Sequence, residues 1–192
     1  RSLGVTPSRK AEAVALAKAI VDEQPSNTEA FHLLAALHNR QGKPDKAIET
    51  LEAGAQANPE EYSLKSMQAR VYAEAGRHEE ALRVLKRMVE LRPDSLQTRV
   101  RLARYYGQLD RIDKAESVLR KAVEANPDSV QVKLALANLL AQRRSVDTAR
   151  DFLTGAIQDN PDMDRLRFSL ADLYERTGKP SKARQVLNKV IE

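Results

Sequence analysis

The chain has 192 residues, of which 42% are hydrophobic, 31% are charged and 4% are aromatic, a balance that favours helices over sheets. It contains no cysteine, which excludes disulfides and thiolate metal sites, and no apolar run approaches the roughly 18 residues of a membrane-spanning helix. Its 32 basic and 27 acidic residues are intermixed and give a net charge of +5, well short of the clustered cationic face of a nucleic-acid-binding protein.

The first part of the chain is expected to contain one helix. Residues 1–7 are predicted to be an irregular lead-in, and Ser8 is placed to cap a helix that runs to about Glu23. This helix aligns with the second helix of a unit that repeats through the rest of the sequence. Residues 1–27 are therefore interpreted as a lead-in and a half repeat with only its second helix. Because the sequence starts at Arg1 without an initiator methionine, we expect it to be an excised or processed piece of a longer chain.

The rest of the sequence repeats every 34 residues without an insertion or deletion. The period is marked by prolines at Pro25, Pro59, Pro93, Pro127 and Pro161. Two columns of alanines have the same period. One contains Ala35, Ala69, Ala103, Ala137 and Ala171, and the other contains Ala47, Ala81, Ala115, Ala149 and Ala183. A column of leucines contains Leu51, Leu85, Leu119, Leu153 and Leu187. The predicted repeats are 28–61, 62–95, 96–129, 130–163 and a shortened 164–192. A fixed period of this length predicts a stacked array of small units, in which alanines let neighbouring helices approach closely.

Each unit is expected to hold two amphipathic helices joined by a short turn. Cap-forming residues follow the prolines, namely Ser26 and Asn27, Asp94 and Ser95, Asp128 and Ser129, and Asp162. The turn between the two helices is predicted to use a positive φ. Glycine adopts this conformation freely at Gly42, Gly76 and Gly178, and aspartate tolerates it at Asp110, whereas Arg144 is expected to adopt it at a cost of about 1 kcal/mol.

These columns resemble the tetratricopeptide repeat family. The resemblance rests on the 34-residue period, the second-helix alanines, the terminal prolines, a small residue after Leu34, Leu102, Leu136 and Leu170, and tyrosines at Tyr72, Tyr106 and Tyr174. It covers essentially the whole chain. It implies an all-α fold, an α-solenoid of antiparallel helix pairs that forms a right-handed superhelix, with residues 1–192 as a single array.

Some columns depart from the family pattern. The early aromatic residue of the family is present only as Phe31, and its column otherwise holds Lys65, Arg99, Lys133 and Arg167. These basic residues are expected to cover apolar surface with their stems while the charged ends reach solvent, with a cation ladder for an acidic partner as the alternative. Gln68 stands where the other units have leucine and is expected to be an amide at the core edge with a hydrogen-bonding partner.

In tetratricopeptide repeat proteins the first helices line the concave inner surface, so the resemblance implies that the side of each first helix opposite the core faces a groove. We call this side the groove face. A helical wheel places on it the candidate partner-binding residues Arg70, Gln97, Val100, Arg104, Gln131, Leu134, Asn138, Arg165 and Phe168.

Three of these candidates are apolar on a face that would be polar if it met only water. Val100, Leu134 and Phe168 fall one repeat apart and form a stripe that a partner helix or extended segment could bury. The alternative is that curvature tucks all three against the neighbouring helix. The amides and arginines around them suit main-chain carbonyls and carboxylates.

Two known binding patterns of the family are absent. Members that hold a C-terminal carboxylate use a lysine whose column here is His32, Ser66, Val100, Leu134 and Phe168. Members attached to O-glycosyltransferases carry an asparagine ladder whose column here is Leu33, Met67, Arg101, Ala135 and Ser169. The sequence therefore predicts neither a receptor for the C-terminal tail of a chaperone nor a repeat domain attached to an O-glycosyltransferase.

Nothing in the sequence points to catalysis. The histidines His32, His38 and His78 are not at metal-ligand spacing, there is no glycine-rich phosphate loop, and no nucleophile has an evident base. We predict a protein that is not an enzyme and uses no cofactor.

The leading hypothesis is a protein–protein interaction scaffold that binds a peptide segment or helix of another protein in the groove. The alternative is a structural array, such as a scaffold of a bacterial envelope or secretion complex, that self-assembles into a homo-oligomer through the ends of the array, where Val186, Val190 and Ile191 lie on the last helix. A weaker alternative is binding of an anionic polymer such as RNA or polysaccharide; membrane insertion is not expected. The sequence is compatible with a bacterial cytoplasm and with a periplasm, and does not choose between them.

Overall fold

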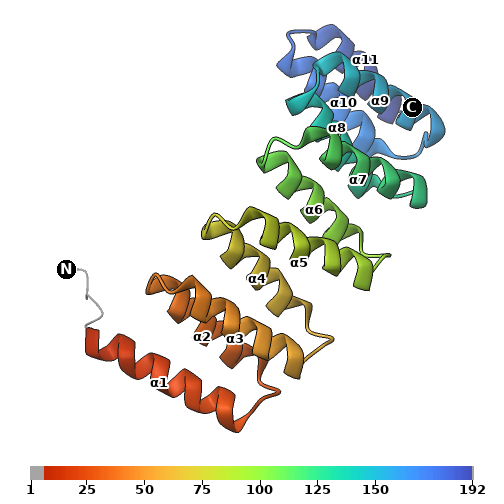
Figure 1. Cartoon of the computed structure of the whole chain (residues 1–192). Helices are drawn as coiled ribbons and strands as arrows, with labels where there is room; N and C mark the ends of the chain where they lie inside the picture. Colours follow the sequence, from red (N-terminus) through yellow and green to blue (C-terminus); the bar gives the residue numbers. More distant parts are fainter. Residues whose placement is uncertain (1–6, 192) are drawn as a thin grey trace. The chain divides into compact units, whose positions relative to one another are not determined.

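The computed structural model describes residues 7–191. Over that range it contains eleven helices and no strand (Figure 1). Of the lead-in expected at residues 1–7, residues 1–6 lie outside the described residues, and the prediction is wrong for Pro7, which is helical. The helix α1 begins at Pro7, so the prediction that Ser8 caps it is wrong: Ser8 is already helical. Proline is favoured at the first helical position because the N–H that it lacks has no partner there.

The chain divides into two compact units, residues 1–92 and 93–192. Unit 1 contains α1 (Pro7–Glu23), α2 (Thr28–Arg40), α3 (Pro44–Ala57), α4 (Tyr62–Glu74) and α5 (His78–Leu91). Unit 2 contains α6 (Leu96–Gln108), α7 (Ile112–Ala125), α8 (Val130–Arg143), α9 (Val146–Asp159), α10 (Asp164–Arg176) and α11 (Pro180–Ile191).

Within each unit, every helix packs against the next one in the chain, and first helices of successive repeats also touch. In unit 1, α2 contacts α4; in unit 2, α8 contacts both α6 and α10. The packing of each helix against the next one in the chain confirms the predicted all-α fold built from antiparallel helix pairs. It places the first helices α6, α8 and α10 side by side, which brings their groove-face residues together.

The turns between paired helices use a positive φ at four of the five predicted positions. Gly42, Gly76 and Gly178 have φ of 70°, 72° and 68°, and Asp110 has φ of 57°. The prediction is wrong for Arg144, which has φ of −115°. In that repeat α8 has 14 residues where α6 and α10 have 13, and an extended Ser145 starts α9. The longer helix and the extended residue replace the left-handed turn, so Arg144 does not adopt a positive φ.

Side-chain caps begin two of the first helices as predicted. Asn27 accepts from a backbone N–H of α2, and Ser95 accepts from one of α6. Asp162 was expected to cap the last first helix, but Met163 occupies the cap position and its side chain makes no such bond. The helix α10 starts in the same register as the other first helices, so Asp162 precedes the cap position, which holds Met163 where α6 and α8 have serine.

The two alanine columns lie at the helix contacts. All ten of these alanines are at most 5% exposed, as expected for positions where backbones approach closely. Four of the five column leucines are buried, and Leu187 in α11 is half-buried. Gln68 is also buried; it donates from Nε2 to Glu52 Oε1 at 3.0 Å, which confirms the predicted partnered amide.

The basic column has a structural role that the sequence pattern did not predict. Lys65 Nζ donates to the carbonyl of Pro59 at 3.3 Å, and Arg99 Nε donates to that of Pro93 at 3.0 Å. Each cation thus fastens the loop that precedes its own helix. The expectation that the charged end reaches solvent is wrong for Lys133, which is only 4% exposed.

Candidate functional site

The nine groove-face candidates lie on first helices, Arg70 on α4 of unit 1 and the other eight on α6, α8 and α10 of unit 2. Seven of them are exposed, and Phe168 has 51% of its surface accessible. Val100 and Leu134 are half-buried. The predicted apolar stripe is therefore uneven, with Phe168 as its most accessible member.

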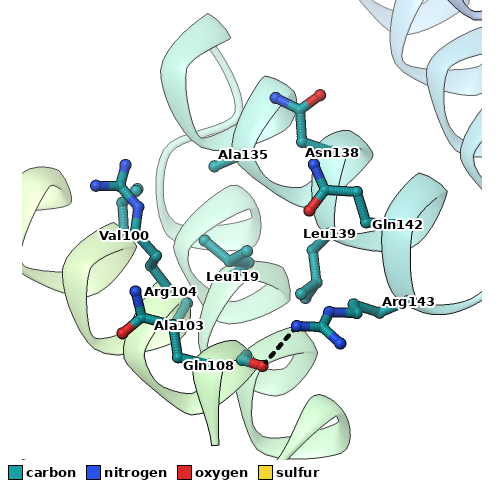
Figure 2. Close-up of a pocket in the computed structure, with 11 residues that line it drawn as sticks. Val100, Ala103, Arg104, Gln108, Leu119, Ala135, Asn138, Leu139, Gln142 and Arg143 are labelled. Carbon is teal, nitrogen blue, oxygen red and sulfur yellow. Dashed lines mark hydrogen bonds between the residues drawn. The ribbon is translucent and has the colours of Figure 1, made fainter. Parts of the chain in front are cut away.

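A pocket of about 320 Å³ lies between α6 and α8 in unit 2 and brings three candidates together, Val100, Arg104 and Asn138 (Figure 2). The other lining residues are Ala103, Gly107 and Gln108 from α6, Leu119 from α7, and Ala135, Leu139, Gln142 and Arg143 from α8. Six candidates do not line it: Arg70, Gln97, Gln131, Leu134, Arg165 and Phe168.

The pocket has an apolar interior and a polar rim. Leu119 and Leu139 extend between the two first helices, beside the alanines at the helix contact (Figure 2). Amide and guanidinium groups of Gln108, Asn138 and Arg104 stand around them. An apolar cavity with a few polar groups at its mouth is the usual composition of a ligand-binding site.

Arg143 closes one end of the pocket. Its Nη2 donates to the carbonyl of Gly107 at 3.1 Å, the bond drawn in Figure 2, and its Nη1 lies 3.6 Å from Asp110 Oδ1. The backbone bond holds the guanidinium at the rim, whereas Asp110 is 85% exposed and its pairing is weak. The N–H donors of the Arg143 guanidinium are therefore held at the pocket edge by the protein itself.

The corresponding place in unit 1 is filled by the protein's own side chains. Two repeats earlier in the sequence, Met67 stands where Ala135 lies, and Asn39 stands where Gly107 lies. Met67 is buried with its sulfur 3.1 Å from His32 Nδ1, and Asn39 Nδ2 donates to Glu74 Oε2 at 2.7 Å across α2 and α4. Unit 2 has smaller residues at both of these repeat positions, and both line its pocket. Comparing the columns could have located it from sequence.

Polar side chains on the groove face of unit 1 mostly bind one another. His32 Nε2 lies 2.6 Å from Ser63 Oγ, and Arg70 pairs with Glu74 at 3.8 Å. Partial burial lowers the pKa of His32 below its usual 6.5, with Glu61 opposing the shift and Arg70 adding to it. The candidate Arg70 is thus paired within its own unit, unlike the candidate Arg104 at the pocket of unit 2.

The charge on the pocket helices is one-sided. α6 contains Arg99, Arg101 and Arg104, α8 contains Lys133 and Arg143, and neither helix contains an aspartate or glutamate. The second helices differ: α7 has three acidic and three basic residues, and α9 has three acidic residues and one basic. Of the other helices of unit 2, α10 has three acidic and three basic residues, and α11 has three basic residues and no acidic one.

The described residues contain no group of three or more histidine, cysteine, aspartate or glutamate side chains that could hold a metal ion. Among the helices of residues 7–191, none combines the length and the hydropathy needed to cross a bilayer.

Comparison with protein families gives matches along nearly the whole chain. One tetratricopeptide repeat model matches residues 8–62 and 32–95, and a second model with the same description matches residues 72–139 and 140–192. No curated protein matches the sequence.

Solved structures with the same arrangement of helices include several bacterial proteins. A tetratricopeptide repeat protein from Parabacteroides merdae ATCC 43184 is 25% identical, with a TM-score of 0.55 over 96% of this chain and 73% of its own. MamA from Desulfovibrio magneticus RS-1 is 17% identical, with a TM-score of 0.52 over 85% of this chain and 93% of its own. YrrB, described as having an unusual peptide-binding site, is 16% identical, with a TM-score of 0.50 over 93% of this chain and 92% of its own.

Proposed function

This chain belongs to the tetratricopeptide repeat family, and we propose that it is a non-catalytic scaffold that binds a peptide segment of a partner protein on the groove face of unit 2. Tetratricopeptide repeats serve as protein–protein interaction scaffolds, which supports the general assignment. The observation that carries the specific proposal is the pocket between α6 and α8, with its apolar interior and exposed polar rim. We further propose that the repeats at 28–61, 62–95, 96–129, 130–163 and 164–192, with the half repeat in 1–27, form a single array.

The chemistry of this face suits a peptide. A partner side chain can bury apolar surface in the pocket, while Gln97, Gln131 and Asn138 are exposed amides that can bind main-chain groups. Phe168 offers a further apolar contact on α10, and Arg165 lies on the same helix. YrrB shows that a related repeat fold can carry a peptide-binding site, which is consistent with this use.

Selection from a library of short random peptides tests the proposal. The full chain should enrich a family of sequences, and replacement of Val100, Leu134 and Phe168 with serine should abolish that enrichment. The matched control is Val146→Ser, which changes an exposed apolar residue on the second helix α9. Circular dichroism shows whether each variant remains helical, and Phe168→Ser alone serves if the half-buried positions do not tolerate serine.

Three results would contradict the proposal. Enrichment of the same peptides by the folded serine variants would place binding elsewhere. Failure to enrich any peptide, together with self-association in light scattering at increasing concentration, would favour the homo-oligomeric array. Tight binding of single-stranded RNA that weakens steeply with salt would favour an anionic polymer as ligand.

A further inference from the structure

The pocket between α6 and α8 is lined by two arginines and by no acidic residue. Arg104 is exposed at the rim, and no ion pair or hydrogen bond engages its guanidinium within residues 7–191. Arg143 presents a second guanidinium that is held by the carbonyl of Gly107. Its single acidic neighbour in the turn, Asp110, lies 3.6 Å away and is 85% exposed. A bound carboxylate could displace so weak a pairing at little cost.

The residue differences that open the pocket also remove negative charge from it. The residue of unit 1 that corresponds to Gln142 is Glu74. It forms an ion pair with Arg70 and accepts a hydrogen bond from Asn39. In unit 2 both members of that pair are replaced by amides, Asn138 and Gln142, and Arg104 stands where unit 1 has Ala36. The guanidinium of Arg104 therefore faces no paired anion within residues 7–191. The two changes act together: one creates space for a side chain, and the other leaves the cation at its mouth without a counter-charge.

The size of the pocket fits one large side chain. An enclosed apolar cavity of about 150 Å³ accommodates a benzene molecule, so about 320 Å³ at an open site has room for an aromatic or branched aliphatic group. Leu119 and Leu139 supply the apolar contacts for such a group, while guanidinium groups form forked bonds to carboxylates beside it.

We propose that the occupant is an acidic peptide segment that inserts one large apolar side chain between α6 and α8 and places carboxylates on Arg104 and Arg143. This inference rests on the proposed function and specifies its ligand. Charge complementarity favours an acidic ligand because Arg104 and Arg143 line the pocket and no acidic residue lines it. It favours a peptide over RNA because no aromatic side chain lines the pocket for base stacking.

The first test is the composition of the selected peptides. Peptides that depend on the groove face should have a net negative charge and share one large apolar residue. Substitution of that residue with alanine, or of the acidic residues with their amides, should weaken binding of a fluorescein-labelled peptide by about tenfold or more. Peptides that depend on the groove face but are neutral or basic would overturn the acidic ligand and leave the proposed function standing.

Two variants test the pocket itself by fluorescence anisotropy with a selected peptide. Ala135→Met places at this position the residue that Met67 supplies in unit 1, so the fold accommodates it there. It should fill the cavity and weaken binding about tenfold without altering the salt dependence. Arg104→Glu should weaken binding by about 10- to 100-fold and reduce its dependence on salt.

Lys121→Glu is the matched control for charge, because it makes the same charge change on an exposed residue of α7. It should change affinity less than threefold, or about 0.6 kcal/mol by the usual conversion. Equal losses for Arg104→Glu and Lys121→Glu would show that only net charge matters and would overturn the assigned contact. Full affinity in the Ala135→Met variant would overturn the assigned pocket, while loss of groove dependence for every peptide would overturn the proposed function as well.

Discussion

Gly54 in α3 of unit 1 provides a quantitative test of the packing. A Cβ added to Gly54 would lie 2.7 Å from Cγ and 2.8 Å from Cδ1 of Phe31, closer than real carbon atoms approach. Phe31 is only 3% exposed, so its ring has little room to move. Overpacking of this kind costs about 1–3 kcal/mol, and alanine recovers about 0.5–1 kcal/mol because it favours the helix. We therefore expect Gly54→Ala to destabilise the protein by up to about 2.5 kcal/mol.

The matched control is Gly155→Ala in α9, where an added Cβ meets no atom within 4 Å. That variant should be stabilised by about 0.5–1 kcal/mol, so the two glycines should change stability in opposite directions. Thermal and urea unfolding followed by circular dichroism measure both effects. Combining Gly54→Ala with Phe31→Leu should recover at least about 0.5 kcal/mol of the loss, because the pair is in contact. If Gly54→Ala stabilised the chain as much as Gly155→Ala, the proposed fit between Gly54 and the Phe31 ring would be refuted.

Three further substitutions test the packing of Leu119, the ionisation of His38 and the exposed ion pair of Glu74. Leu119→Ala should destabilise the protein by about 2–5 kcal/mol in urea unfolding, since the leucine is 3% exposed and its loss leaves a cavity; a smaller loss would indicate a loosely packed site. Burial lowers the pKa of His38 below 6.5, with Lys46 and Lys43 adding to the shift, so its contribution to stability is complete above that pH and is lost as the pH falls. His38→Tyr, which supplies the residue of its repeat column, should therefore reduce the fall in melting temperature between about pH 7 and pH 5, and an unchanged pH profile would contradict this. Glu74→Ala removes an exposed pairing and should change stability by less than about 0.5 kcal/mol in the same unfolding assay.

The fold could be predicted because every repeat encodes the same contact. A residue such as Ala103 must be small where two helix backbones meet, and copying the unit copies that requirement. The period therefore reveals the packing even though no single helix is decisive. The burial of Gln68 was also predictable, since it occupies a column of buried leucines.

Local backbone and polar contacts were harder to predict. Arg144 escapes the left-handed conformation because α8 is one residue longer, a shift that turn preferences alone do not reveal. The role of Lys65 in binding the carbonyl of Pro59 depends on how the loop folds back toward its helix. A helical wheel gives the direction of a side chain but does not give the acceptor that it reaches.

The candidate site was predictable as a face but not as a pocket. The wheel assigns Val100, Arg104, Asn138 and Leu134 to the same helix side, but only the first three line the pocket. Which candidates meet depends on the residues between them. Ala135 and Gly107 open the space, and their effect appears only when the same positions of unit 1 are compared.

The central claim is that a partner peptide binds unit 2 through the groove face of α6 and α8. Its most direct test is the change in backbone amide chemical shifts of the full chain as a selected peptide is added. We predict that the largest changes fall on Arg104, Gly107, Ala135 and Asn138, with small changes along the exposed residues of α7 and α9. Changes concentrated on α7 and α9, with the pocket residues unaffected, would contradict the account.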